Sequence, residues 1–166
     1  MTSSILSHQE VVDEVAYITA SPLDITAMLG KTHNPRAGAI VLFSGEVRNH
    51  SNGKNVIYLE YEAQEKMASK LIKEIIAEAK NKWHLTIAVA VHRVGKVAVC
   101  ESAVAVITAS PHRHEAFIAN RYIIDRIKHE LPIWKCEYFE DGTKQWGGNC
   151  NCHNITGEVG KHVYDA

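Results

Sequence analysis

The sequence predicts an α+β fold, with a mixed or antiparallel sheet and two long helices. Apolar residues recur at every fourth position between residues 64 and 83, the spacing of an amphipathic helix, and a second helical pattern follows residue 110. Five or so strand-length segments are interleaved with these helices, and two of them form an apparent hairpin. A hairpin does not belong to the regular alternation of a doubly wound parallel sheet.

Length and composition predict one compact domain. A chain of 166 residues is long enough to bury a core without disulfides or metal ions. Residues 1–10 are polar and lack apolar periodicity, so they are expected to be a flexible terminus. The domain is expected over residues 11–149, followed by an irregular tail over residues 150–166.

The charge pattern argues against nucleic acid or a membrane as the main partner. Acidic and basic residues nearly balance, with a formal charge of −1 and a pI near 6.8. No apolar run approaches the roughly 18 residues that a membrane span needs. The first residues lack the basic and apolar segments of a secretory signal, so we expect a soluble cytoplasmic protein with free thiols.

The first elements are predicted to form a small peripheral unit. Residues 15–19 favour a strand, and the turn-forming segment 21–24 leads into a short helix over residues 25–29. Gly30 ends that helix. The mostly apolar residues 39–47 then predict a buried strand.

A hairpin and a long helix are predicted next. Residues 56–62 alternate and are rich in β-formers, so we expect them to pair with residues 39–47. The polar segment between them contains Asn52-Gly53, and a loop longer than the tight two-residue type is expected. In the helix over residues 64–83, the expected apolar stripe is Met67, Leu71, Ile75, Ala79 and Trp83.

The last third of the domain is predicted to contain two strands, a helix and a final strand. Residues 86–94 and 103–109 are strand-like, with a turn at Gly95 between them. Ser110-Pro111 indicates a cap followed by proline in the first helical turn. Pro132 ends this helix, and residues 133–139 predict the final strand. The helix's expected apolar stripe is Phe117, Ile124, Ile127 and Leu131.

Five cationic or imidazole side chains stand at the ends of these elements, where functional sites are usually built. They are Arg48, His112, Arg113, Lys128 and Lys135. A helix N-terminus attracts anions through its unpaired N–H groups, so His112 and Arg113 suit a phosphate or carboxylate. The alternative is that each is an ordinary solvated surface charge.

Lys128 and Lys135 flank the corner at Pro132 and are candidates for acid–base chemistry. Two ammonium groups in one partly desolvated pocket lower each other's pKa, so one can act as a base or nucleophile while the other binds an anion. In the alternative interpretation, Lys128 complements the helix dipole and Lys135 lies on the exposed face of its strand.

The cysteines give a weaker signal for a metal site. Cys150, Cys152 and His153 resemble zinc ligands, and His112 and His114 add two more nitrogens, but the paired Cys spacing of structural zinc sites is absent. A zinc hydrolase is therefore a minor alternative. Cys100 and Cys136 are on strand-like segments and are expected to pack as small hydrophobic side chains.

Taken together, several motifs resemble one known family, the large catalytic subunit of molybdopterin synthase. The resemblance runs in order from about Gly38 to Trp146, which is most of the chain. Its motifs are Phe43-Ser-Gly-Glu-Val-Arg48-Asn-His, Leu59-Glu-Tyr-Glu, His92-Arg-Val-Gly, Ser110-Pro-His-Arg113 with Ala116-Phe117, and Pro132-Ile-Trp-Lys135-Cys-Glu137.

This resemblance implies an enzyme of molybdenum cofactor biosynthesis. Such an enzyme converts cyclic pyranopterin monophosphate to molybdopterin by installing two sulfurs as a dithiolene. The sulfur arrives as a thiocarboxylate on the C-terminal Gly-Gly of a small ubiquitin-like subunit, so neither a metal nor a cofactor is required. The implied fold is the α/β-hammerhead type, and the implied assembly is a heterotetramer built around a homodimer of large subunits.

The resemblance also implies roles for individual residues. Lys128 and Lys135 match the two catalytic lysines. Arg48, His112 and Arg113 match residues that bind the substrate, partly across the dimer, and Phe43 matches an aromatic wall of the pocket.

Two departures from the family pattern limit the transfer. Ser-Pro-His-Arg replaces the usual Ser-Ala-His-Arg, which a first helical turn tolerates. After Trp146 the sequence no longer matches, so no role is carried beyond it. A non-catalytic module that binds an anion or a partner's C-terminal tail is the main alternative.

Overall fold

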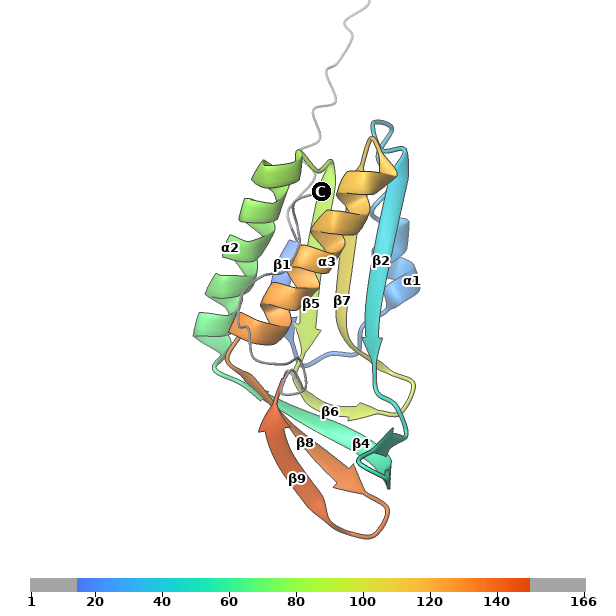
Figure 1. The fold of residues 1–166 in the computed structure, drawn as a ribbon, viewed down its shortest axis with the longest axis vertical. Coiled ribbons are helices and arrows are strands. Elements are labelled where there is room, and N and C mark those ends of the chain that lie inside the picture. The colour runs from blue at the N-terminus through green and yellow to red at the C-terminus, as the bar shows by residue number, and fades with distance from the viewer. Residues whose placement is uncertain (1–14, 150–166) are drawn as a thin grey trace, which may run out of the picture.

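The computed structural model describes residues 15–149, which form two sheets and three helices (Figure 1). In spatial order, the first sheet contains β1 (Val15–Thr19), β5 (Ile87–Arg93), β7 (Ser102–Ser110) and β2 (Ala39–Glu46). The second contains β3 (His50–Ser51), β4 (Lys54–Ala63), β8 (Ile133–Phe139) and β9 (Lys144–Gly148), with β6 (Gly95–Ala98) also paired to β4. The predicted α+β class is confirmed.

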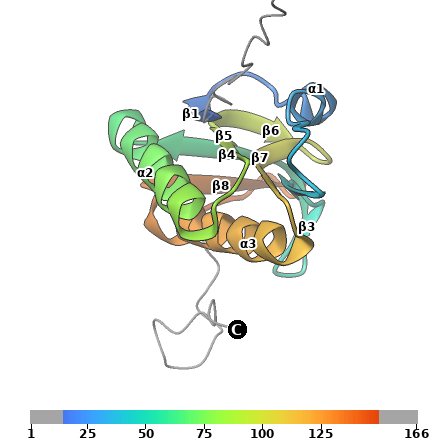
Figure 2. The same ribbon diagram turned by 90° about the horizontal axis from the view of Figure 1, so that it is seen from above.

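The first sheet lies between the helices. Figure 2 shows α2 (Glu65–Trp83) and α3 (Arg113–Glu130) side by side on one face, with α1 (Ile25–Gly30) on the other. The sheet is mixed, because β1 runs parallel to β5 while the other pairs are antiparallel. Both faces of β5 and β7 are therefore covered, and every residue of these strands is buried. Within residues 15–149, neither long helix is apolar enough to cross a bilayer.

The long helix α2 forms where it was predicted, with its apolar face slightly rotated. Ile75 and Ala79 are buried as expected, whereas Met67 is half exposed. Ile72 and Ile76, outside the predicted stripe, are fully buried, and burying such a side chain contributes about 1.5–3 kcal/mol. The helix therefore faces the sheet along Ala68, Ile72, Ile75, Ile76 and Ala79.

The predicted hairpin between residues 39–47 and 56–62 does not form. Strand β2 pairs with β7 in the first sheet, whereas β4 pairs with β6 and β8 in the second. A two-residue turn at Asn52 and Gly53, both with positive φ, instead joins β3 to β4. The expectation of a longer loop was therefore wrong, because the chain changes sheets before it turns.

The first turns of α3 pack on the sheet through small side chains, and Ile123, Ile124 and Ile127 continue the buried face. Ala116 and Ala119 are buried, and Asn120 Nδ2 donates to the carbonyls of Val41 and Val106 at 3.0 and 3.1 Å, which joins the helix to β2 and β7. Phe117, predicted in the apolar stripe, is 61% exposed. That prediction was wrong, because the helix turns its alanine side toward the sheet and leaves the large ring outside.

The start of α3 also differs in detail from the prediction. The N-cap is His112, one residue after Pro111, and Ser110 is not the cap. The Ser110 hydroxyl donates instead to the carbonyl of His112. Gly38 packs against this turn so closely that a Cβ atom there would lie 2.4 Å from the Pro111 carbonyl oxygen.

The end of α3 forms the predicted corner at Pro132. The helix ends at Glu130, and Leu131 is already extended. The Pro132 carbonyl accepts a hydrogen bond of 3.0 Å from the Gln64 N–H, immediately before α2. Strand β8 then begins at Ile133 and runs antiparallel to β4.

The two described cysteines occupy different environments. Cys136 is fully buried in β8, as expected. Cys100 is exposed and has a φ of 70° in the turn between β6 and β7, so its predicted place on a packed strand was wrong.

Candidate functional site

Lys128 and Lys135 line the same pocket, which has a volume of about 240 Å³. Lys128 comes from the last turn of α3, and Lys135 is the third residue of β8. Arg48 also lines this pocket from the chain that follows β2. Other parts of the wall are Gly45, Tyr61 and Glu137. We call this the lysine pocket.

Burial in the lysine pocket strongly shifts the pKa of Lys128. Burial, together with the positive charge of Lys135, lowers the pKa of Lys128 from 10.5 to about 8. About a tenth of Lys128 is therefore neutral at pH 7. A neutral amine is a base and a nucleophile, whereas an ammonium group is neither.

Lys135 differs from Lys128 because it has an anionic neighbour. Its Nζ lies 3.6 Å from Glu137 Oε1 in an ion pair. The other carboxylate oxygen of Glu137 accepts a hydrogen bond of 3.0 Å from the Ser51 hydroxyl. Glu137 was not predicted as a site residue, although its place two residues after Lys135 puts both on one face of β8.

Arg48 stands exposed at the margin of the lysine pocket. Its Nε donates to the His50 carbonyl at 3.1 Å, which anchors the guanidinium group to the backbone. An anchored guanidinium group binds carboxylate and phosphate oxygens through paired hydrogen bonds. The lysine pocket therefore combines a neutralisable amine with cations that attract an anionic ligand.

Phe43 stands next to the lysine pocket through its contact with Gly45. The two residues share a face of β2, and a Cβ atom on Gly45 would lie 3.2 Å from the Phe43 ring. The same Cβ atom would lie 2.6 Å from a Val104 methyl group. Glycine is therefore needed for this close packing, which keeps the partly exposed Phe43 ring beside the pocket wall.

His112 and Arg113 do not join the lysines within one chain. They line a second pocket of about 680 Å³ at the start of α3, together with Gly38 and Phe117. Lys128 follows Arg113 by 15 residues on the same helix, and at about 1.5 Å per residue the separation is about 22 Å. The five predicted groups therefore divide between the two ends of α3.

Two buried side chains behind Lys128 were not predicted from the sequence. Lys128 Nζ donates to Asn149 Oδ1 at 3.0 Å, and Asn149 Nδ2 lies 3.2 Å from His92 Nε2. His92 Nδ1 lies 2.8 Å from the Arg93 carbonyl oxygen. Burial, followed by the charge of Lys128, lowers the pKa of His92 to about 3. Neither residue stands in a spacing pattern that indicates this contact.

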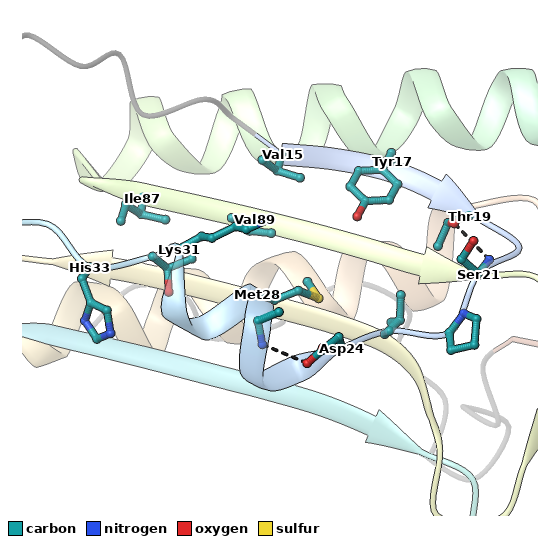
Figure 3. A pocket seen from close by; sticks show the side chains of 14 residues that line it. Val15, Tyr17, Thr19, Ser21, Asp24, Met28, Lys31, His33, Ile87 and Val89 are labelled. Atoms are coloured by element: carbon teal, nitrogen blue, oxygen red, sulfur yellow. Dashed lines mark hydrogen bonds between the residues drawn. The ribbon is translucent and has the colours of Figure 1, made fainter.

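A third pocket, of about 710 Å³, lies between α1 and the sheet face formed by β1 and β5 (Figure 3). None of the predicted site residues lines it. Two of its polar side chains take part in local structure: Asp24 caps α1 by accepting from the Ala27 N–H, and Thr19 accepts from the Ser21 N–H.

The zinc alternative receives no support from residues 15–149. Within this part of the chain, no three His, Cys, Asp or Glu side chains are close enough to hold a metal ion. Cys150, Cys152 and His153, on which the zinc alternative depends, lie outside the described residues.

Comparison with known sequences shows one consistent similarity. A family model described as MoaE protein matches residues 18–130. The molybdopterin synthase catalytic subunit of Bacillus subtilis is 44% identical over 132 residues, which cover 80% of this chain and 83% of that one. The subunit of the same description from Thermoplasma volcanium is 43% identical over 133 residues, covering 80% and 95%.

Solved structures show the same similarity in three dimensions. The crystal structure of molybdopterin synthase from Staphylococcus aureus superposes with a TM-score of 0.75 and 41% sequence identity. The superposition covers 80% of this chain and 96% of the Staphylococcus aureus chain. A complex of subunits 1 and 2 of molybdopterin-converting factor from Helicobacter pylori shares the fold at a TM-score of 0.65 and 21% identity, covering 78% and 88%.

Proposed function

The chain belongs to the MoaE family of molybdopterin synthase catalytic subunits, enzymes of molybdenum cofactor biosynthesis, and from this premise we propose that its lysine pocket carries out sulfur transfer. The substrate is cyclic pyranopterin monophosphate, and the product is molybdopterin with its dithiolene. The sulfur donor is a thiocarboxylate on the C-terminal Gly-Gly of a small ubiquitin-like subunit. The observation that carries this proposal is the shared pocket of Lys128 and Lys135.

The two lysines take different roles in this proposal. Lys135, paired with Glu137, and Arg48 bind the anionic groups of the pterin and of the thiocarboxylate. Lys128, whose pKa is about 8, is the base. Phe43 forms a wall beside Gly45.

Each transfer can be written so that its atoms balance. In the first transfer the thiocarboxylate sulfur bonds to one pterin side-chain carbon as that carbon's bond to a cyclic phosphate oxygen breaks, and the oxygen stays on the phosphate. In the second transfer the sulfur replaces the carbonyl oxygen of the neighbouring carbon, which leaves as water. Either step leaves a thioester between carrier and pterin. Water then adds to the acyl carbon and loses a proton to neutral Lys128. When the acyl carbon–sulfur bond breaks, the sulfur stays on the pterin and the carrier ends as a carboxylate. Two such transfers produce the dithiolene.

In this proposal the second pocket, which His112 and Arg113 line, contributes to the site across a homodimer. His112 and Arg113 lie about 22 Å from Lys128 along α3, too far to hold the same small substrate in one chain. We place them, in a second copy of the chain, against the lysine pocket of the first, where they bind the pterin phosphate. Two large and two small subunits then form the heterotetramer.

A reconstitution experiment tests this function. The chain is incubated with cyclic pyranopterin monophosphate and thiocarboxylated small subunit, and the product is oxidised and measured by fluorescence. A small subunit that ends in an ordinary carboxylate is the matched control, because it binds but carries no sulfur. Product with the first carrier alone supports sulfur transfer, whereas complex formation without product with either carrier would leave only a tail-binding module.

A further inference from the structure

We propose that His92 and Asn149 are positioning residues that hold Lys128 toward the reacting groups through a neutral hydrogen-bond relay. Three consecutive hydrogen bonds link the Arg93 carbonyl to His92, His92 to Asn149, and Asn149 to Lys128. We call this series the amide relay. The inference rests on the proposed function of Lys128 as a base. It assigns a role to Asn149, three residues after Trp146, where the motif resemblance to the family ends.

The direction of every bond in the amide relay follows from its first member. A carbonyl oxygen only accepts, so the Arg93 carbonyl requires the proton of His92 on Nδ1. In the neutral ring Nε2 is then an acceptor, and it takes a proton from the Asn149 amide nitrogen. The Asn149 oxygen is consequently left to face Lys128. One backbone carbonyl thus determines which atom Lys128 meets.

Burial keeps the relay in this state. The His92 side chain is fully buried in β5, and the Tyr61 ring packs against it in an edge-to-face arrangement with centroids 5.2 Å apart. Asn149 is 8% exposed. The pKa of His92 is about 3, so the ring remains neutral and the direction of the relay does not reverse at physiological pH.

A neutral acceptor matters because of the other charges around Lys128. Lys135 and Glu137 face it from β8, Glu46 from the end of β2, Arg48 from the chain after β2, His50 from β3 and Tyr61 from β4. A carboxylate at position 149 would also orient Lys128, but it would stabilise the ammonium form. An amide orients the side chain without adding a charge, so a part of Lys128 stays neutral.

The decisive variant is Asn149→Asp, which keeps the size of the side chain, adds one negative charge and removes the N–H that His92 Nε2 accepts. We expect the pKa of Lys128 to rise by one unit or more, which lowers the neutral fraction about tenfold at pH 7. In the reconstituted reaction, kcat should fall by a similar factor at pH 7 and recover at higher pH. KM for the pterin should change little, because Arg48 and Lys135 are untouched.

Asn81→Asp is the matched control. Asn81 is exposed near the far end of α2, so the substitution adds the same charge away from the pocket. Its pH profile should coincide with that of the unmodified chain. A second variant, Asn149→Ala, removes the acceptor without adding charge, and we expect a lower kcat with no displacement of the pH profile.

Lysine side-chain NMR separates this inference from the proposed function. The Lys128 signal, assigned by its absence in Lys128→Met, reports the pKa without substrate. If the unmodified chain is inactive but Asn149→Asp still raises the Lys128 pKa, the relay stands and sulfur transfer fails. If the unmodified chain is active and Asn149→Asp changes neither the Lys128 signal nor the pH profile, the relay is wrong.

Discussion

Lys128 and Lys135 line one pocket although Pro132 separates the helix of the first from the strand of the second. The corner is held by the hydrogen bond from the Gln64 N–H to the Pro132 carbonyl. Both lysines therefore project from regular elements and not from a loop, which limits how far either can move from the other.

Removing one lysine should abolish synthesis without unfolding the chain. We expect Lys135→Ala to lower molybdopterin formation by about 10²-fold or more, since it deletes a charged group at the reacting centre. The measurement is the fluorescent oxidised product, with circular dichroism to verify the fold. Lys144→Ala on the adjacent strand β9 is the control, because Lys144 is exposed and should tolerate the change. Full turnover by Lys135→Ala would contradict the assignment of Lys135 to the reacting centre.

The reaction rate should rise with pH through the pKa of Lys128. A base must be neutral, and the pKa of about 8 means that neutral Lys128 increases about tenfold per pH unit below 8 and levels off above it. We expect kcat/KM between pH 6.5 and 9 to follow this curve. A flat profile across that interval would contradict the role of Lys128 as a base.

Replacing Lys128 by methionine should make the inactive protein more stable. Each pKa unit corresponds to about 1.4 kcal/mol, so charging the buried amine costs about 3 kcal/mol at pH 7. Part of this gain is offset because Lys128→Met leaves the Asn149 oxygen without its donor. We expect a net increase of about 1–2 kcal/mol in the free energy of unfolding, measured by urea denaturation.

The pH dependence of this gain has a definite sign. Folding lowers the Lys128 pKa to about 8, so the destabilisation is complete below pH 8 and disappears as the pH rises toward 10.5. The advantage of Lys128→Met should therefore shrink across that interval. Lys66→Met, at an exposed position of α2, is the control and should show no such trend.

Two inactive variants should restore each other if the site is shared between copies. In a mixed dimer of Lys135→Ala and Arg113→Ala chains, one of the two sites has all its native residues. Random mixing makes about half of the dimers mixed, so about a quarter of the original activity is expected. The measurement is product formation after the two variants are unfolded and refolded together. If each variant is inactive alone and the mixture does not recover activity, Arg113 acts in its own chain and the shared site is wrong.

The sequence predicted the long elements better than their partners. Strand-length apolar patterns show that residues 39–46 are a strand, but they do not identify β7, some sixty residues later, as its neighbour. The stripe of α3 was misplaced at Phe117 because a large aromatic residue is usually buried. In the structure the sheet packs closely against Ala116 and Ala119, and the Phe117 ring lies outside this contact.

The cationic residues of the candidate site were predicted from the sequence, whereas the buried polar residues behind them were not. The sequence indicates which charged residues stand at the ends of helices and strands, and it predicted Arg48, Lys128 and Lys135 on this basis. The polar groups behind these side chains could not be predicted from the sequence, because Asn149 and His92 come into contact only when β5 and the end of β9 pack together. No local spacing encodes such a contact.

The length of α3 has a consequence for the concentration dependence of the enzyme. Because its 18 residues separate the two pockets, under the proposed arrangement an isolated chain lacks half of its binding groups. Specific activity should therefore fall on dilution, as dimers dissociate by mass action.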